Sequence, residues 1–308
     1  MDTTWKYNPI KILIMALIVS LCLPVNGSSQ ESKENKDKSL DKSLNAARES
    51  LEHTKARLRK AMQPSPENLK NLGNVCGLVF DVFGGENRNV YGVNIAGICA
   101  DTINDVTGIQ AGGVTSVTMG TMTGAQISGL LNLAGKTKGI QISGVGNLAE
   151  KMTGVEIAGM FNVGVENTKG IQIVGFANVN IENVKGVEIA GMFNVGAKNT
   201  KGIQAGGIMS VTMGTMTGAQ ISGLLNLAGK TKGIQISGLG NFAEKKMTGI
   251  QASVFNNRAE QVKGMQIGIS NNCKKMKGVQ IGLFNRIDNG ILPFFPIINM
   301  NFSSRSEE

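Results

Sequence analysis

The sequence GVEIAGMFNVGVENTK at 154–169 decides the fold, because it recurs almost unchanged as GVEIAGMFNVGAKNTK at 186–201. Looser copies run along most of the chain, each opened by a glycine, and consecutive opening glycines lie 14 to 16 residues apart. Self-similarity at a short fixed period is typical of repeat proteins, in which each unit packs on its neighbours. The fourteen unit glycines are Gly77, Gly92, Gly108, Gly124, Gly139, Gly154, Gly170, Gly186, Gly202, Gly218, Gly233, Gly249, Gly264 and Gly278.

Each unit alternates apolar, polar and apolar residues after its glycine, which is the signature of a β-strand. The polar member is almost always an amide or its acid: Asn94, Gln110, Gln126, Gln141, Glu156, Gln172, Glu188, Gln204, Gln220, Gln235, Gln251, Gln266 and Gln280. A second small residue follows, then an apolar residue and an asparagine. These asparagines are Asn132, Asn147, Asn162, Asn178, Asn194, Asn226, Asn241, Asn256, Asn271 and Asn285, with Ser116 and Ser210 in their place in two units.

These units predict an all-β solenoid of about fourteen coils over 71–290. Stacked coils place equivalent side chains about 4.8 Å apart, so columns of glutamine and of asparagine can hydrogen bond along the stack. We expect the unit glycines at tight corners that a β-carbon would obstruct. Residues 108–153 recur almost unchanged from position 202. Copying six units in line requires a fold that is open-ended in one dimension.

A transmembrane barrel is the alternative architecture, because alternating segments separated by polar turns are also typical of membrane-spanning strands. Such barrels carry two girdles of tryptophan and tyrosine, whereas this chain has one Trp and two Tyr. Glycine also interrupts each unit, so no unbroken lipid-facing column forms. The composition therefore favours the solenoid over an outer-membrane β-barrel protein.

The N-terminal residues read as a signal peptide over 1–27. A basic segment precedes the apolar run at 12–23, and Val25 and Gly27 suit a signal-peptidase site. Cys22 leaves lipidation open as an alternative. Residues 28–70 form a polar segment with an amphipathic helix expected over 39–62, where apolar residues recur at steps of three and four. This helix either lies on the first coil or forms a weak homo-oligomer through residues 39–62.

The C-terminal residues 291–308 break the repeat and predict an aromatic C-terminal cap and tail, with Phe294, Phe295 and Phe302 as plugs. GVQIGLFN at 278–285, followed by NGILPFFPIINMNF at 289–302, resembles the end of bacterial surface repeat-containing proteins of the leptospiral and Bacteroidetes type. Their repeats read GVQIGLxN and their tails NG-x-LP-x-x-P-aromatic. The resemblance spans about 77–302 and implies an exported, surface-associated protein of undetermined biochemical role.

The chain contains few residues of the types that catalysis usually requires. It has a single His, no CxxC pair and no clustered acids beyond Asp101 and Asp105, which suit turns. We therefore expect no enzyme, no catalytic, cofactor-binding or metal site, and no cofactor. The cysteines Cys76 and Cys99 could pair after export, or remain free thiols like Cys273.

Lysines precede several unit glycines, among them Lys169, Lys185 and Lys201, and could form a basic stripe. Such a stripe could meet acidic glycans or an anionic membrane surface, or simply keep the protein soluble. Aromatic residues are not interleaved with it, so no nucleic acid is expected as a partner. The sequence predicts an exported, non-catalytic surface repeat protein, located at the cell surface, in the outer membrane or outside the cell. It would present an extended β face to a protein or glycan, or serve a structural envelope role.

Overall fold

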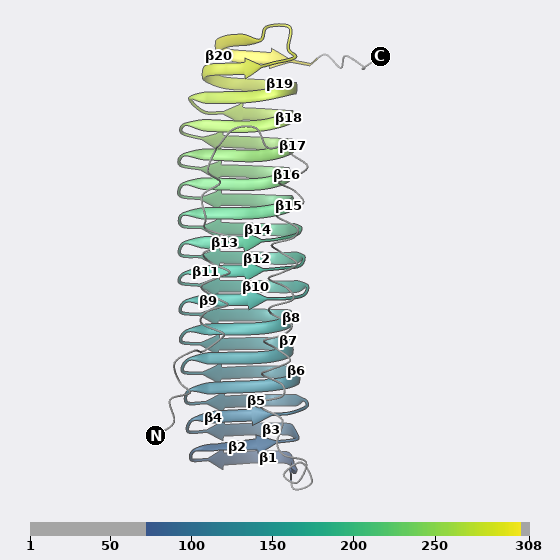
Figure 1. Ribbon diagram of the computed structural model, residues 1–308, viewed down its shortest axis with the longest axis vertical. Helices are drawn as coiled ribbons and strands as arrows, with labels where there is room; N and C mark the ends of the chain where they lie inside the picture. Colours follow the sequence, from purple (N-terminus) through teal and green to yellow (C-terminus); the bar gives the residue numbers. More distant parts are fainter. Residues whose placement is uncertain (1–71, 303–308) are drawn as a thin grey trace, which may run out of the picture. The chain divides into compact units, whose positions relative to one another are not determined.

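The computed structural model describes residues 72–302, and these form an all-β solenoid (Figure 1). The signal peptide at 1–27, the segment at 28–70 with its expected helix over 39–62, and the tail beyond 302 lie outside the described residues. Within 72–302 every regular element is a strand, so this part of the chain contains no helix that could cross a membrane.

All twenty strands belong to one continuous sheet wound around the solenoid. Their bounds are β1 Asn74–Asp81, β2 Gly84–Asn87, β3 Asn89–Ala96, β4 Cys99–Thr102, β5 Val106–Gly112, β6 Thr115–Ser128, β7 Leu131–Ser143, β8 Gly146–Ala158, β9 Phe161–Gly164, β10 Thr168–Val174, β11 Ala177–Asn180, β12 Val184–Ala190, β13 Phe193–Gly196, β14 Thr200–Gly206, β15 Met209–Ser222, β16 Leu225–Ser237, β17 Gly240–Ser253, β18 Asn256–Ile267, β19 Ser270–Ile287 and β20 Phe294–Asn301.

Each turn contributes a long strand segment that contains the unit glycine and a short one. From β6 onward the short segment contains the asparagine of the column or a serine in its place, whereas β2 and β4 have Gly85 and Ala100 there. In the middle of the solenoid the two segments are separate strands, such as β10 and β11; in β6 to β8 and β15 to β19 they run on into one another. Every turn pairs in parallel with the next, and the register sets glycine beside glycine, as with Gly170 and Gly186. Thirteen full turns separate the first unit glycine from the last, one fewer than the number of units. This parallel pairing does not support the barrel alternative.

The unit glycines lie within strand segments, and the strand bends there: the side chains of Thr200 and Gln204 meet at 3.5 Å across Gly202, which a straight strand would not allow. All fourteen have positive φ, between 104° at Gly77 and 150° at Gly186 and Gly278, a region that side chains other than hydrogen rarely tolerate. The space beside the α-carbon is also filled, because a Cβ on Gly186 would collide with the main-chain carbonyl oxygen of Gly170. A column of bare α-carbons therefore lets consecutive turns stack closely at this point.

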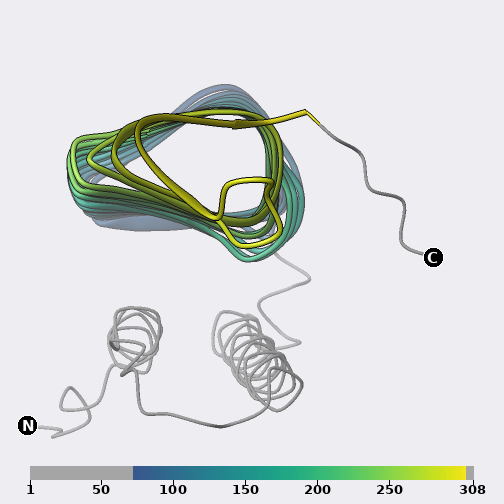
Figure 2. The same cartoon turned by 90° about the horizontal axis from the view of Figure 1, so that it is seen from above.

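The interior of the solenoid is polar to an unusual degree. Viewed from above, the turns of the described part superimpose around an enclosed interior that side chains fill (Figure 2). Every residue of the glutamine column, from Asn94 to Gln280, is fully buried, and so is the asparagine column. Apolar residues complete the interior as smaller columns, such as Met122, Met152 and Met216. Asn257, not the expected Asn256, continues the asparagine column, because Asn257 pairs in register with Asn241 and Asn271.

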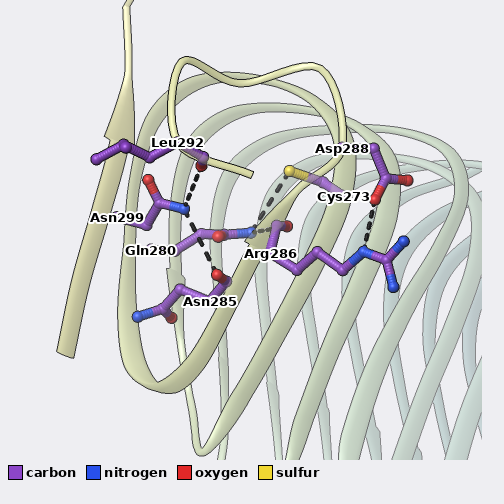
Figure 3. A network of polar contacts seen from close by, with 7 residues as sticks. All are labelled: Cys273, Gln280, Asn285, Arg286, Asp288, Leu292 and Asn299. Atoms are coloured by element: carbon purple, nitrogen blue, oxygen red, sulfur yellow. Dashed lines mark hydrogen bonds and ion pairs between the residues drawn. The ribbon is translucent and has the colours of Figure 1, made fainter. Parts of the chain in front are cut away.

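The C-terminal end is closed by β20, which runs antiparallel to β19 and so ends the parallel stack. Its phenylalanines are not plugs, since Phe294, Phe295 and Phe302 remain 47 to 59% exposed. Polar contacts close the core instead (Figure 3): the Asn299 amide donates to the carbonyl oxygens of Leu292 at 3.1 Å and Asn285 at 3.5 Å.

The three described cysteines are free, so Cys76 and Cys99 form no disulfide. Cys76 lies on β1 and Cys99 on β4, and they pair with different neighbours, Tyr91 and Gly84. Burial raises the pKa of the Cys273 thiol to about 12, because the thiolate would lose its hydration. At neutral pH this thiol is a packing group of the core rather than a reactive one.

Gly186→Ala is expected to destabilise the solenoid strongly, because it combines a positive φ with a backbone collision. Backbone strain of this kind costs about 1 to 3 kcal/mol, and the collision adds to it. A lower urea midpoint, followed by far-UV circular dichroism, measures the effect. Gly73→Ala is the control, since nothing lies within 4 Å of a Cβ there. Equal midpoints for the two variants would contradict this role of the glycine column.

Candidate binding face and the polar core behind it

The long strand segment of each turn alternates strictly between interior and exterior, and β7 shows the pattern most clearly. Its inward side chains include Thr137 and Gln141, both buried. Its outward side chains are Lys136, Lys138, Ile140 and Ile142, all exposed. One strand therefore presents two cationic and two aliphatic side chains to the outside, in that order.

The same order continues over ten turns, from the turn of Gly139 to that of Gly278. We name this surface, which bends at the unit glycines as the Thr200–Gln204 contact across Gly202 shows, the lysine–isoleucine face. Its cationic columns occupy the positions three and one residues before the unit glycine, and contain Lys136, Lys138, Lys151, Lys169, Lys185, Lys201, Lys230, Lys232, Lys246, Lys263, Lys275 and Lys277. The remaining positions of these columns hold Asn, Gln or Thr. No aspartate or glutamate occupies either column in these ten turns.

The aliphatic columns occupy the positions one and three residues after the unit glycine. The first contains Ile140, Val155, Ile171, Val187, Ile203, Ala219, Ile234, Ile250, Met265 and Val279, and the second Ile142, Ile157, Ile173, Ile189, Ala205, Ile221, Ile236, Ala252, Ile267 and Ile281. In the second column the isoleucines are 37 to 45% exposed although each is flanked by the turns above and below. Consequently the outer surface of these strands carries two columns rich in isoleucine, whereas the buried apolar residues are mainly methionine, valine and alanine.

Behind this face the glutamine column forms a hydrogen-bonded ladder. In each link the side-chain Nε2 of one turn donates to the Oε1 of the turn before, for example from Gln235 to Gln220 and from Gln251 to Gln235, both at 2.8 Å. The links continue through Gln266 to Gln280. Because the donors all point toward the N-terminal end, each glutamine inside this run, such as Gln235 and Gln251, donates to one neighbour and accepts from the other.

The asparagine column forms a second ladder whose donors point the opposite way. Asn132 Nδ2 donates to Asn147 Oδ1 at 2.9 Å, and the next link, from Asn147 to Asn162, is 3.0 Å. The same Nδ2 of Asn132 also donates to the main-chain oxygen of Ile142 at 2.8 Å. The asparagines therefore connect the short segment of one turn to the strand that carries the isoleucines in the next.

Two glutamates interrupt the glutamine ladder. A neighbouring side chain supplies the missing hydrogen-bond donor at Glu188 but not at Glu156. Glu188 accepts from Gln204 Nε2 at 2.7 Å and from Asn180 Nδ2 at 2.6 Å. Asn180 also donates to Gln172 Oε1 at 2.7 Å, and so supplies the donor that a glutamate lacks. The Gln172 ladder position therefore remains connected to Glu188 through Asn180.

Glu156 has no such partner, because Ala149 occupies the place that Asn180 takes at Glu188. Its Oε2 accepts from Gln172 at 2.6 Å, but its Oε1 and the neighbouring Gln141 Oε1 both lack a hydrogen-bond donor. Burial raises the pKa of the Glu156 carboxyl to about 7, against a lowering by the Gln172 hydrogen bond. A proton on Glu156 would supply the missing donor to Gln141 and complete the ladder.

The two acids that the sequence offered as nearest to a catalytic site, Asp101 and Asp105, have different partners. Asp105 is exposed and accepts the main-chain N–H of Thr121, one turn later, at 2.6 Å, as a turn-forming residue does. Asp101 lies in register with Glu86 instead, and burial together with the Glu86 charge raises its pKa to about 6. Within residues 72–302 no group of three or more His, Cys, Asp or Glu side chains is placed to hold a metal ion.

The basic stripe expected from the sequence is present. Lys169, Lys185 and Lys201 are exposed and stand in register on β10, β12 and β14. Sequence reasoning did not find the aliphatic columns beside them, since the alternation does not say which side of the strand faces inward. The burial of every glutamine is the observation that decides this.

None of the protein-family models, curated proteins or solved structures compared with this chain matches it. The fold class of the described residues, a β-solenoid, therefore rests on the pairing and burial given above.

Glu156→Gln is expected to stabilise the protein above pH 7 and to leave it nearly unchanged near pH 4.5. The raised pKa means that the folded protein holds a proton which the unfolded chain loses above its ordinary value of 4.5. Stability is thus full below about pH 4.5, falls by about 1.4 kcal/mol per pH unit toward pH 7, and then levels off. The amide removes this loss and donates to Gln141. Urea midpoints at pH 4.5 and pH 8 measure it, with a gain of about 2 kcal/mol expected at pH 8.

Glu188→Gln is the matched control. Both oxygens of Glu188 accept hydrogen bonds, so an amide there must turn its N–H toward the donor on Asn180 or on Gln204. Burial raises the pKa of the Glu188 carboxyl to about 7 as well, so its replacement removes the same loss of stability at high pH. Because the amide also breaks a hydrogen bond, we expect a smaller gain at pH 8 than from Glu156→Gln. Equal gains from both variants would show that loss of a buried charge, rather than completion of the ladder, governs the effect.

Proposed function

We propose that the protein is an exported, non-catalytic surface repeat protein that binds a component of the cell envelope through the lysine–isoleucine face. The observation that carries the proposal is the continuity of this face: four outward columns repeat over ten turns without an acidic residue. Exposed apolar patches larger than a few hundred Å² mark interaction sites on soluble proteins. A face of this length suits a large or repetitive partner better than a small ligand.

Export and surface association are supported by the sequence. The leader-like residues 1–27 and the resemblance of 278–302 to the end of bacterial surface repeat proteins point in the same direction. The absence of a catalytic role is supported by the chemistry of the core, whose polar groups are amides committed to ladders. We propose that the solenoid serves as a rigid support and that its outer columns do the binding.

The face variant Lys169→Gln, Lys185→Gln, Lys201→Gln, Ile171→Thr and Ile173→Thr is expected to lose envelope binding by at least about tenfold, because each lost charge contributes on the order of 1 kcal/mol near an anionic surface. Threonine is β-branched and suits a strand, so the solenoid should persist. Retention of added purified protein on washed envelopes of the producing bacterium measures binding.

The control variant makes the same types of change outside the four columns, at the corner beside them: Lys198→Gln, Lys245→Gln, Lys274→Gln, Ile103→Thr and Ile181→Thr. Lys198 and Lys274 form exposed ion pairs with Glu182 and Glu260, which contribute little to stability. Circular dichroism confirms folding of both variants. Equal retention of the two variants would overturn the proposed function.

A further inference from the structure

The bend at each unit glycine separates the two halves of the lysine–isoleucine face. Inside the solenoid the side chains of Thr200 and Gln204 meet across Gly202, so the outward side chains before and after the glycine diverge. The lysine columns and the aliphatic columns therefore lie on two adjoining sides of the turn, whose outline is three-sided (Figure 2). We name the side that carries the aliphatic columns the isoleucine side.

The isoleucine side is longer than the ten turns of the lysine–isoleucine face. Each of the fourteen units has an apolar residue at the positions one and three residues after its glycine. No charged or polar residue occupies either position in any unit. The four units before Gly139 contribute Leu78, Phe80, Val93, Ile95, Ile109, Ala111, Ala125 and Ile127.

The isoleucine side is also regular along the whole stack. Every pairing between successive turns, from β1 with β3 to β18 with β19, stays in register from the unit glycine to the third residue after it. The register shifts of the parallel pairings all lie before the unit glycine, as between Thr212 and Thr215. The two columns are therefore parallel rows of aliphatic side chains, about 7 Å apart.

The size of the isoleucine side matches that of a stable dimer interface. Fourteen turns at about 4.8 Å and four strand residues at about 3.3 Å give it roughly 800 Å². An apolar patch of this size exceeds the largest patch on a typical monomer, which is about 300 to 600 Å². Two such sides in contact would bury about 1,600 Å² in total, as a standard protein–protein interface does. The core of such interfaces is also depleted of charged residues.

Three kinds of occupant fit this side to different degrees. A planar anionic partner on the lysine columns would not cover the isoleucine side, because the strand bends between them. A soluble polyanion would neutralise the lysines and leave the aliphatic columns in water. A second copy of this chain offers a side of the same length, the same regularity and the same lack of charge.

We propose that two copies of this chain associate through their isoleucine sides, related by a two-fold axis parallel to the solenoid axis. With this axis, the column one residue after the glycine in one copy faces the column three residues after the glycine in the other. The lysine columns of the two copies then lie at opposite edges of the interface. A two-fold axis across the solenoid would bring both sets of lysines to the same edge, where like charges repel.

This inference goes beyond the proposed function, since it gives the aliphatic columns a partner of their own. The lysine columns stay outside the interface and remain available to the envelope. A dimer of this kind would present two sets of lysine columns, one from each copy.

Analytical ultracentrifugation of the purified protein tests the association. We expect a dimer, and we expect Ile157→Lys with Ile189→Lys to raise its dissociation constant at least about 100-fold, because each copy loses two apolar contacts and would bury two charges. The matched control, Ile103→Lys with Ile181→Lys, lies outside both columns and should change the constant by no more than about threefold. Circular dichroism checks that both variants fold. A monomeric protein, or equal dissociation by both variants, would overturn the proposal.

A disulfide test measures the orientation without disturbing the charge. Ile234→Cys with Ile236→Cys places one thiol in each column of a turn that lies away from the middle of the solenoid. In the proposed dimer these thiols face one another between copies, so oxidation should give a covalent dimer on a non-reducing gel. With the axis across the middle of the solenoid, the two turns would be about 34 Å apart, too far for a disulfide.

The unmodified chain is the control for the native cysteines, and no more covalent dimer than it gives would exclude the parallel arrangement. A monomer whose Lys169→Gln, Lys185→Gln and Lys201→Gln variant loses envelope retention would overturn the dimer and leave the proposed function intact. A dimer whose lysine variant is retained normally would overturn the proposed function alone.

Discussion

Hydrogen bonds between buried carboxamides, passed from one turn to the next, are the interaction on which the rest of this solenoid depends. A carboxamide can donate on one side and accept on the other, so a column of glutamines satisfies itself without water. The column works only if equivalent residues lie one strand spacing apart. Parallel, in-register stacking of every turn follows, as does the glycine column, because Gly170 and Gly186 must approach without side chains.

The polar core also determines which side chains point outward. Successive side chains of a strand point to opposite faces, so a glutamine that points inward sends its two neighbours outward. In this chain those neighbours are aliphatic, as with Ile140 and Ile142 around Gln141. An ordinary sheet protein buries such residues and hydrates its amides. Here the ladders share the core with columns of buried methionine, valine and alanine, and many isoleucines lie on the outside.

The repeat, the strand character, the solenoid and both ladders were predictable from the sequence, because a short period and a fixed donor-acceptor residue leave few packings. The inward direction of the amides was not, since alternation is the same read from either side of a strand. The unit glycines were expected at bends, and the strand does bend at Gly202; the close approach of their α-carbons between turns was not expected, because it depends on contact between turns, which one unit does not reveal. Asn257 was missed because two asparagines adjoin in that unit and only the register distinguishes them. The phenylalanines of the tail resembled plugs, yet β20 turns them outward and ends the core with Asn299.

The two buried glutamates show how the charge of the inner ladder relates to the charge of the outer face. Glu188 keeps both oxygens hydrogen bonded because Asn180 supplies a donor, whereas Glu156 lacks one unless it is protonated. A protonated Glu156 carries no charge and cannot compensate the lysines on the other side of the same sheet. Even an ionised Glu188 faces the interior, away from the lysine columns. The two buried glutamates therefore do not neutralise the lysine columns, which point outward from the same strands.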